Sequence, residues 1–273
     1  MTHEPTGIFA DISNQDYHGG PGVSKGHLDK VRRGLEYYHA EQIEGHKPPP
    51  SPAMIAGTIA HCAVLEPDRF ERVYMRAIEG DGRTKAIKDA RKQQREDNPT
   101  KEIVPVDLYD RCLGMAAAVK AHPMASKLLR EGTPEQSAFW HDKATGLYCR
   151  CRPDWVLPDG NTIVDLKTTS DPDLRVWTRK AASLRYHVQA AWYSDGYEAA
   201  TGHAVTPDNF VFVVVGQEYP HACYCVTMSP VDIIAGRVAY RDDLSALAAA
   251  KQTGEYHSFP QDEIVEIELP GWA

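Results

Sequence analysis

Apolar residues recur at helical spacing through the first half of the chain. Four of them stand three or four positions apart within residues 24–40, which predicts a helix capped by Ser24. Residues 53–66 are apolar on nearly every side, so we expect a second helix that is buried in the core. Residues 106–131 have an amphipathic pattern that Pro123 interrupts. The N-terminal half is therefore predicted to be mainly helical.

The segments between these helices have a different composition. Residues 1–22 contain several glycines and predict an irregular arm. Residues 47–52 are rich in proline and predict a stiff linker. Residues 80–99 are polar and form the most basic stretch of the chain. Such a stretch is either a solvated segment or an arm that contacts phosphates, and the sequence favours neither.

The second half of the chain reads as strands alternating with helices. Residues 210–215 are continuously apolar, as in a strand buried on both faces. Further strands are predicted over residues 136–142, 147–157, 162–168 and 222–228, and helices over 173–182, 186–200 and 231–250. The order α-β-β-β-α-β predicts an α/β fold with a mixed central sheet flanked by helices. We expect one domain over residues 1–273, divided into a helical part (1–131), a core (132–230), and a C-terminal helix and tail (231–273).

A predicted β-hairpin lies at the centre of this core. Asp159-Gly160 is a strong turn signal, because glycine accepts a positive φ angle. Pairing outward from this turn places Asp154 opposite Asp165, with both side chains on one face. Lys167 lies on the same face, because side chains alternate along a strand. Pro153 cannot donate a ladder hydrogen bond and can shift this register.

Two opposed carboxylates repel each other unless a cation lies between them. A divalent metal such as Mg²⁺ suits such a pair, and Lys167 would then lie beside the metal-bound water. The alternative is a surface hairpin whose acids are simply solvated. The opposed pair together with a lysine on the same face favours the metal site.

Composition and charge narrow the possible functions. The net charge of −8 argues against broad attraction to polyanions, although a local basic groove is compatible with it. No apolar run is long enough to cross a bilayer, and the N-terminus lacks the pattern of a signal peptide. The six cysteines do not have zinc-finger spacing, so we expect free thiols and a cytoplasmic location.

Four further residues are candidates for the same site. His61 lies within the apolar helix, and Glu135 stands just before the first strand of the core. Gln189 and Tyr193 are four residues apart and share a helix face. Each is weak evidence alone, since a histidine in a helix is more often structural and surface acids are common. They point to one site only if the hairpin is that site.

Taken together, these residues resemble the PD-(D/E)XK nuclease superfamily, with Pro153-Asp154 and Asp165-Leu166-Lys167 as its signature. The surrounding sequence resembles the RecE family, the phage and prophage exodeoxyribonuclease VIII proteins, from about Tyr17 to Val215. The matching segments are YHGGPGVSK, GTIAHCAVLEPDRF, CRCRPDWVLPDG, IVDLKTT and YHVQAAWYSDGYEAATG.

The resemblance implies a role for each candidate. His61, Asp154, Asp165 and the backbone carbonyl of Leu166 would bind the metal, which would be Mg²⁺ with Mn²⁺ as a substitute. Lys167 would position the attacking water, and Glu135 would be an accessory acid. Gln189 and Tyr193 would support substrate and active-site geometry. Ser24, Lys25 and Arg32 would contact DNA.

The resemblance also implies a function. We expect an exodeoxyribonuclease that digests double-stranded DNA from its ends in the 5′→3′ direction during phage-type recombination. A ring of four subunits and a partner single-strand annealing protein are implied in the same way. The alternatives are a structure-specific or restriction-type endonuclease with the same core, and a catalytically idle module that binds DNA ends.

Overall fold

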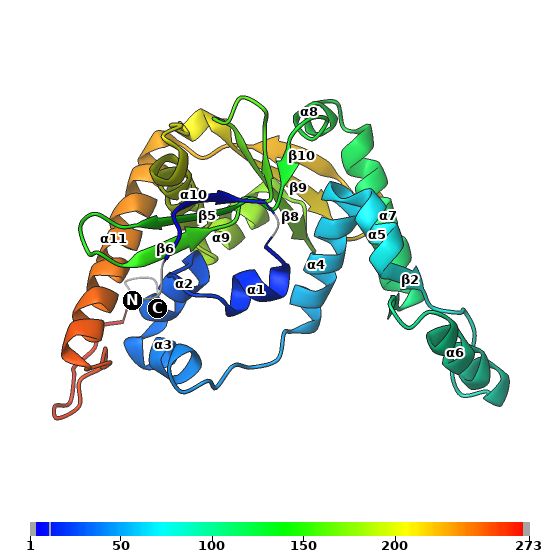
Figure 1. Cartoon of the computed structure of the whole chain (residues 1–273), viewed down its shortest axis with the longest axis horizontal. Helices are drawn as coiled ribbons and strands as arrows, with labels where there is room; N and C mark the ends of the chain where they lie inside the picture. The colour runs from blue at the N-terminus through cyan, green and yellow to red at the C-terminus, as the bar shows by residue number, and fades with distance from the viewer. Residues whose placement is uncertain (1–3, 11, 270–273) are drawn as a thin grey trace.

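The computed structural model describes residues 4–10 and 12–269, which form layers of helices around a mixed sheet (Figure 1). The helices are α1 (Asn14–Gly19), α2 (Lys25–Arg33), α3 (Leu35–Gln42), α4 (Pro52–Leu65), α5 (Pro67–Val73), α6 (Lys85–Asp97), α7 (Val106–Ala121), α8 (Pro123–Leu128), α9 (Leu174–Ser183), α10 (Tyr186–Thr201) and α11 (Pro230–Thr253). The strands are β1 (Gly7–Phe9), β2 (Tyr74–Arg76), β3 (Glu102–Val104), β4 (Thr133–Pro134), β5 (Ser137–His141), β6 (Tyr148–Cys151), β7 (Trp155–Val156), β8 (Ile163–Thr169), β9 (Phe210–Gly216) and β10 (Cys223–Val226). None of the described helices is both long and apolar enough to span a membrane.

The central sheet has five strands in the order β10-β9-β8-β7-β4. Strands β8 and β9 pair in parallel, and the other pairs are antiparallel, so the sheet is mixed. Strand β9 is the continuous apolar run, and it is buried because helices cover both faces of the sheet. The prediction of an α/β fold with a mixed central sheet is confirmed.

Each face of the sheet has its own core. Phe212 and Val214 pack with residues of α2, α9, α10 and α11, whereas Val213 and Val215 pack with residues of α4, α5 and α7. This division follows from the alternation of side chains along a strand. Val164 and Leu166 of β8 belong to the second core. Asp165, between them, therefore points toward α10.

The predicted hairpin register is confirmed where the strands pair. Trp155 lies opposite Val164, and Val156 lies opposite Ile163. The prediction of a single strand over residues 147–157 is wrong, because the chain passes between two sheets at Pro153. Strand β6 ends before this proline and pairs with β5 in a separate three-stranded sheet, β1-β5-β6. A proline cannot continue the ladder, so the chain passes from one sheet to the other at this point.

The N-terminal elements differ from their prediction in the arm and at Gly34. The arm expected to be irregular contains β1 and α1. The helix expected over residues 24–40 is divided into α2 and α3 by Gly34, whose φ angle of 151° is incompatible with a helix. The basic stretch contains a regular helix, α6. By contrast, Pro123 separates α7 from α8 as predicted.

Helix α4 is buried only in part. Its second half is covered by the core, but Met54 in its first turn is 63% exposed. The sequence predicted a helix buried throughout, because apolar residues occupy all its faces. The exposed first turn borders an open cavity, which local sequence does not reveal.

Helices α10 and α11 approach each other closely at Gly236. A Cβ atom added to this glycine would lie 2.3 Å from the backbone oxygen of His187. Backbone cannot move aside as a flexible side chain can, so the contact requires glycine. Helix α10 carries Gln189 and Tyr193, and this contact therefore sets the position of both residues.

We expect Gly236→Ala to lower the free energy of unfolding by about 1–3 kcal/mol, because the added methyl overpacks this helix contact. Chemical denaturation monitored by circular dichroism measures the change. Gly26→Ala is the matched control, since only the Ser24 Oγ at 3.9 Å lies near its added Cβ, and this variant should be neutral or stabilising. Equal stability of the two variants would contradict the close approach.

Candidate metal centre

Three potential metal ligands converge from separate parts of the chain. His61 comes from α4, Glu135 follows β4, and Asp154 lies in the bend between β6 and β7. One ligand atom from each lies within 4.8 Å of the other two. The Nδ1 atom of His61 is 3.4 Å from Oδ2 of Asp154. Two acids and a histidine at this spacing can bind one cation together.

Backbone hydrogen bonds fix the two acids of this group. The Leu166 N–H donates to Oδ2 of Asp154 over 2.8 Å. The Glu135 N–H donates to the Asp154 carbonyl over 3.1 Å. Glu135 has a φ angle of 53°, in the left-handed region that non-glycine residues seldom adopt. Strain of this kind is found most often at functional sites, where surrounding contacts maintain it.

Asp165 lies beside this group on the neighbouring strand, and its side chain is fully buried. Its Oδ2 accepts a hydrogen bond of 2.6 Å from Nε2 of Gln189. Its Oδ1 is ion-paired with Lys167 but accepts no hydrogen bond from the described residues. Lys167 also lies over the ring of Tyr186, with Nζ 4.7 Å from the ring centre. The face of β8 thus carries an acid and a lysine in direct contact.

Burial and mutual repulsion change the ionisation of these groups. Burial, together with the nearby Asp154 carboxylate, raises the pKa of Glu135 to about 8. Burial also raises the pKa of Asp165 to about 7, although Lys167 opposes the shift. Burial disfavours the Lys167 charge, but Asp165 and Asp154 outweigh it and raise the pKa of this lysine. Burial lowers the pKa of His61, which leaves its imidazole neutral and able to bind a metal.

These residues fit a divalent metal ion. Carboxylate oxygens are the ligands that Mg²⁺ and Mn²⁺ prefer, and a neutral imidazole adds a nitrogen donor. Two ionised carboxylates within 4.8 Å of each other repel by about 3 kcal/mol or more at an effective dielectric constant of 20, a cost that a bound cation would reverse. The sequence placed Asp165 and Leu166 in the ligand set and gave Glu135 an accessory role. In the structure Glu135 stands in the compact group, whereas Asp165 contacts Lys167 and Gln189.

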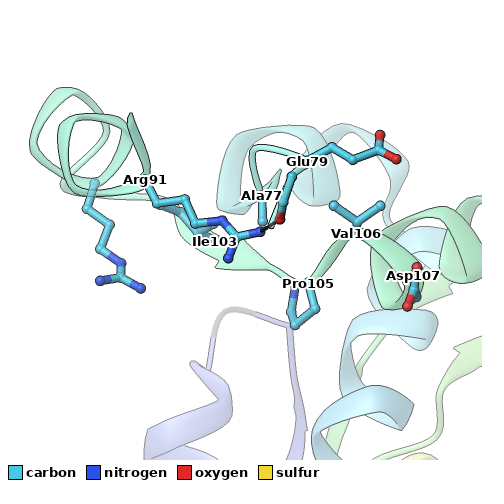
Figure 2. A pocket seen from close by; sticks show the side chains of 9 residues that line it. Ala77, Glu79, Arg91, Ile103, Pro105, Val106 and Asp107 are labelled. Atoms are coloured by element: carbon cyan, nitrogen blue, oxygen red, sulfur yellow. Dashed lines mark hydrogen bonds between the residues drawn. The ribbon is translucent and has the colours of Figure 1, made fainter. Parts of the chain in front are cut away.

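A cavity of about 900 Å³ opens onto this group. His61, Glu135, Asp154, Lys167 and Tyr193 all line it. Burial raises the pKa of Tyr193 well above its usual value, so its hydroxyl stays protonated and able to donate. A smaller hollow of about 420 Å³, at the root of α6, contains none of these residues (Figure 2). The larger cavity can admit a substrate to the acidic group.

The three residues proposed to contact DNA lie on or next to α2. Ser24 caps this helix, and its backbone N–H donates to Nδ1 of His27 over 3.2 Å. Lys25 donates to the Leu184 carbonyl over 2.9 Å and forms an ion pair with Asp29 at 2.7 Å. Its positive charge also acts to lower the pKa of Asp165. Arg32 is exposed near the end of the helix. None of the three lines the cavity, so their role in DNA binding stays a prediction.

Sequence reasoning missed Arg152 and the wall formed by α1. Arg152 is buried, and its Nη1 atom lies 4.0 Å from the Glu135 carboxylate. Its guanidinium donates to Ser137 and stacks 4.0 Å from the ring centre of Tyr17. The alternation in Cys149-Arg150-Cys151-Arg152 was a usable signal, because it places both arginines opposite two core cysteines. Tyr17 and His18 line the cavity, a position that the irregular arm did not suggest.

Comparison with known proteins identifies the family and supports the fold. The family described as "PDDEXK-like domain of unknown function (DUF3799)" matches residues 28–259. The chain belongs to this family. The fold of this PDDEXK-like protein is also similar to that of a protein from Eubacterium rectale whose solved structure is named "Putative exonuclease". The two share 13% sequence identity and a TM-score of 0.59 over 95% of this chain and 94% of the other.

No curated protein matches the chain. At 13% identity the similarity to the solved structure establishes the fold alone. The family match identifies a PDDEXK-like domain, the class that the signature residues had indicated. PD-(D/E)XK nucleases typically use divalent metals, which suits the group formed by His61, Glu135 and Asp154.

Metal affinity should depend steeply on pH. Glu135 and Asp165 bind protons until the pH passes about 8 and about 7, and a proton competes with the metal for the same oxygens. We expect the affinity for Mn²⁺ to rise by about tenfold per pH unit for each proton released, between pH 6 and 8. Isothermal titration calorimetry in buffers of different ionisation heat measures both affinity and proton release. A pH-independent affinity would contradict ligation by these carboxylates.

Proposed function

We propose that this protein is a metal-dependent exodeoxyribonuclease that hydrolyses phosphodiester bonds at the ends of double-stranded DNA. The observation that carries the proposal is the group of His61, Glu135 and Asp154 beside the buried Asp165–Lys167 pair, at the wall of an open cavity. Mg²⁺ is the proposed metal, and Mn²⁺ suits the same ligands.

The four potential ligands would hold the metal in place. His61 and Asp154 offer atoms only 3.4 Å apart, and Glu135 completes the group. Asp165 can contribute an oxygen from the adjoining strand. When bound, the metal supplies charge stabilisation for the phosphoryl group and a more acidic water. Gln189 positions Asp165 through its hydrogen bond of 2.6 Å to Oδ2, so Oδ1 is the oxygen that Asp165 would offer to a metal.

Lys167 is placed to act on the attacking water. Its ammonium group lines the cavity and carries a full charge, because two neighbouring carboxylates raise its pKa. A fixed cation at this position can orient a water molecule toward the phosphorus and stabilise the negative charge that develops on the phosphoryl oxygens. Tyr193 lines the same cavity and can donate a hydrogen bond to a substrate phosphate.

A cysteine nucleophile is the main alternative chemistry at this cavity, since Cys62 lines it next to His61. Burial raises the pKa of the Cys62 thiol to about 11. A thiol with so high a pKa is almost entirely protonated at neutral pH, and only a thiolate attacks efficiently. The residues therefore favour attack by water over covalent catalysis.

The finer features of the proposal are supported by sequence resemblance alone. They are 5′→3′ digestion, assembly as a ring of four subunits, cooperation with a single-strand annealing protein in phage-type recombination, and a cytoplasmic location. They follow the similarity of the segments around Tyr17, His61, Asp154 and Gln189 to the RecE family.

The exonuclease should degrade linear duplex DNA and leave a closed circle intact. The test incubates both substrates, with label at either the 5′ or the 3′ end of the linear one, in Mg²⁺, in Mn²⁺ or in chelator. Asp154→Asn and Lys167→Met should each lower the rate on the order of a thousandfold, since each removes several kcal/mol of stabilisation from the reaction. Asp242→Asn is the control, because this exposed acid on α11 lies outside the site.

Cleavage of the closed circle would contradict the exonuclease proposal and show that the protein is an endonuclease. Undiminished activity of both variants would refute the proposed site. Chelator should abolish digestion, and added metal should restore it.

A further inference from the structure

Helix α6 projects from the rest of the protein at the end of an arm (Figure 1). The arm begins with β2, ends with β3, and holds α6 between them. None of the residues of α6 is buried. A helix of 13 residues without a buried residue is marginal in water, so burial of apolar area does not explain why the arm is there.

Polar contacts define the shape of this arm. The Arg91 guanidinium donates to the carbonyls of Ile78 and Gly80, and Figure 2 shows this side chain reaching from α6 toward the end of β2. Gln94 accepts from the Ile78 N–H and donates to the Arg76 carbonyl. At the base, Arg76 binds Asp110 of α7 through two hydrogen bonds. Arg91 and Gln94 therefore mark the face of α6 that lies against the arm.

The side of α6 adjoining Arg91 carries an aligned row of cations, whose last member, Arg95, also lines the smaller hollow. Lys85, Lys88, Lys92 and Arg95 are spaced by three, four and three residues. At 100° per residue, this spacing places all four side chains within one narrow stripe along the helix. The stripe is about 15 Å long, from the rise of 1.5 Å per residue between Lys85 and Arg95. We call these four residues the cationic stripe.

The cationic stripe is little neutralised by its neighbours. Residues 83–95 contain six basic side chains and one acid, in a chain whose net charge is −8. Lys92 has an acid within reach, Glu96, at 3.8 Å. Among the described residues, Lys85, Lys88 and Arg95 have no carboxylate within 4.0 Å. Like charges three or four residues apart destabilise a helix, so a polyanion bound along the stripe would stabilise it.

The base of the arm and the proposed active site share one wall. Tyr74 lines the cavity of the metal centre and is also the first residue of β2, from which the arm extends. Helix α5 leads directly into β2, and its Arg69 lines the same cavity. The chain thus runs from the catalytic cavity straight into the arm that displays the cationic stripe.

We propose that the cationic stripe binds the phosphate backbone of the DNA duplex that flanks the scissile end. This inference rests on the proposed function and adds a second contact with the substrate, outside the site of hydrolysis. Phosphates along one strand are spaced by a few ångströms, so a stripe of about 15 Å can contact several of them. The contact is with phosphates and is independent of base sequence.

The test compares two full-length variants that each lose four positive charges. One replaces the cationic stripe (Lys85→Gln, Lys88→Gln, Lys92→Gln, Arg95→Gln). The matched control replaces four exposed cations elsewhere (Lys120→Gln, Lys127→Gln, Arg130→Gln, Lys143→Gln). Fluorescence anisotropy measures binding to a 30-base-pair duplex of mixed sequence at several salt concentrations, with Asp154→Asn in every protein to prevent cleavage.

We expect the stripe variant to bind DNA at least about tenfold more weakly at low salt. The slope of log affinity against log salt should become shallower by up to about 3.6, since each of the four lost phosphate contacts removes roughly 0.9. The control should change both quantities far less. Equal effects of the two variants would overturn the proposal, and so would a change in solution mass with unaltered DNA binding, which would assign the arm to contacts between copies of the protein.

Binding and hydrolysis are measured separately, so the two proposals fail in different ways. Weaker binding by the stripe variant would support DNA binding by the cationic stripe, whether or not the protein hydrolyses DNA. Absence of hydrolysis by the protein with Asp154 intact would refute the proposed nuclease function. Hydrolysis by the intact protein, together with unchanged binding by the stripe variant, would refute only the proposal that the cationic stripe binds DNA.

Discussion

The crowding of one buried and two half-buried carboxylates is the constraint on which this structure depends. Asp165 is fully enclosed, and Glu135 and Asp154 lie within ligand distance of each other. Ionisation of an acid costs free energy in such surroundings, and this cost raises the pKa values of Glu135 and Asp165. The neighbouring residues offset part of the cost. Lys167 pairs with Asp165, Gln189 donates to it, the Leu166 N–H donates to Asp154, and Arg152 approaches Glu135. A bound divalent cation would offset the remainder.

The fold brings these groups together at the point where two sheets separate. The chain leaves the smaller sheet after β6, turns at Pro153, and enters the central sheet at β7. Asp154 therefore lies in the bend, where its carboxylate accepts the hydrogen bond from the Leu166 N–H. The same separation lets α4 bring His61 to the opening and lets α1 close one wall of the cavity. Helix α10, held against α11 at Gly236, supplies Gln189 from the other face of the sheet. The acids of the site thus come from a bend and a strand, and the groups that support them come from helices on both faces.

The sequence predicted the parts of this arrangement that local patterns control. The Asp159-Gly160 turn set the hairpin register, and the apolar run of β9 identified the central strand. Sequence periodicity did not show that Pro153 separates two sheets, since a proline is equally compatible with an edge or a bulge. The inclusion of Glu135 in the compact group depends on its left-handed backbone, and the role of Arg152 depends on packing against Tyr17. Both are tertiary effects that residue spacing alone does not encode.

The most direct measurement of the central claim is thermal unfolding of the wild type and of Glu135→Gln, with and without Mn²⁺, at pH 8.5. The pKa of Glu135 is raised in the folded protein, so its stabilising contribution is present at low pH and is lost as the pH rises through about 8. Without metal, the uncharged glutamine should make the variant more stable than the wild type, by on the order of 1 kcal/mol or more. With Mn²⁺ at a hundredfold excess over its dissociation constant, the wild type should gain about 2.7 kcal/mol, and the variant should gain much less. An equal response of the two proteins to Mn²⁺ would contradict a metal centre built around Glu135, His61 and Asp154.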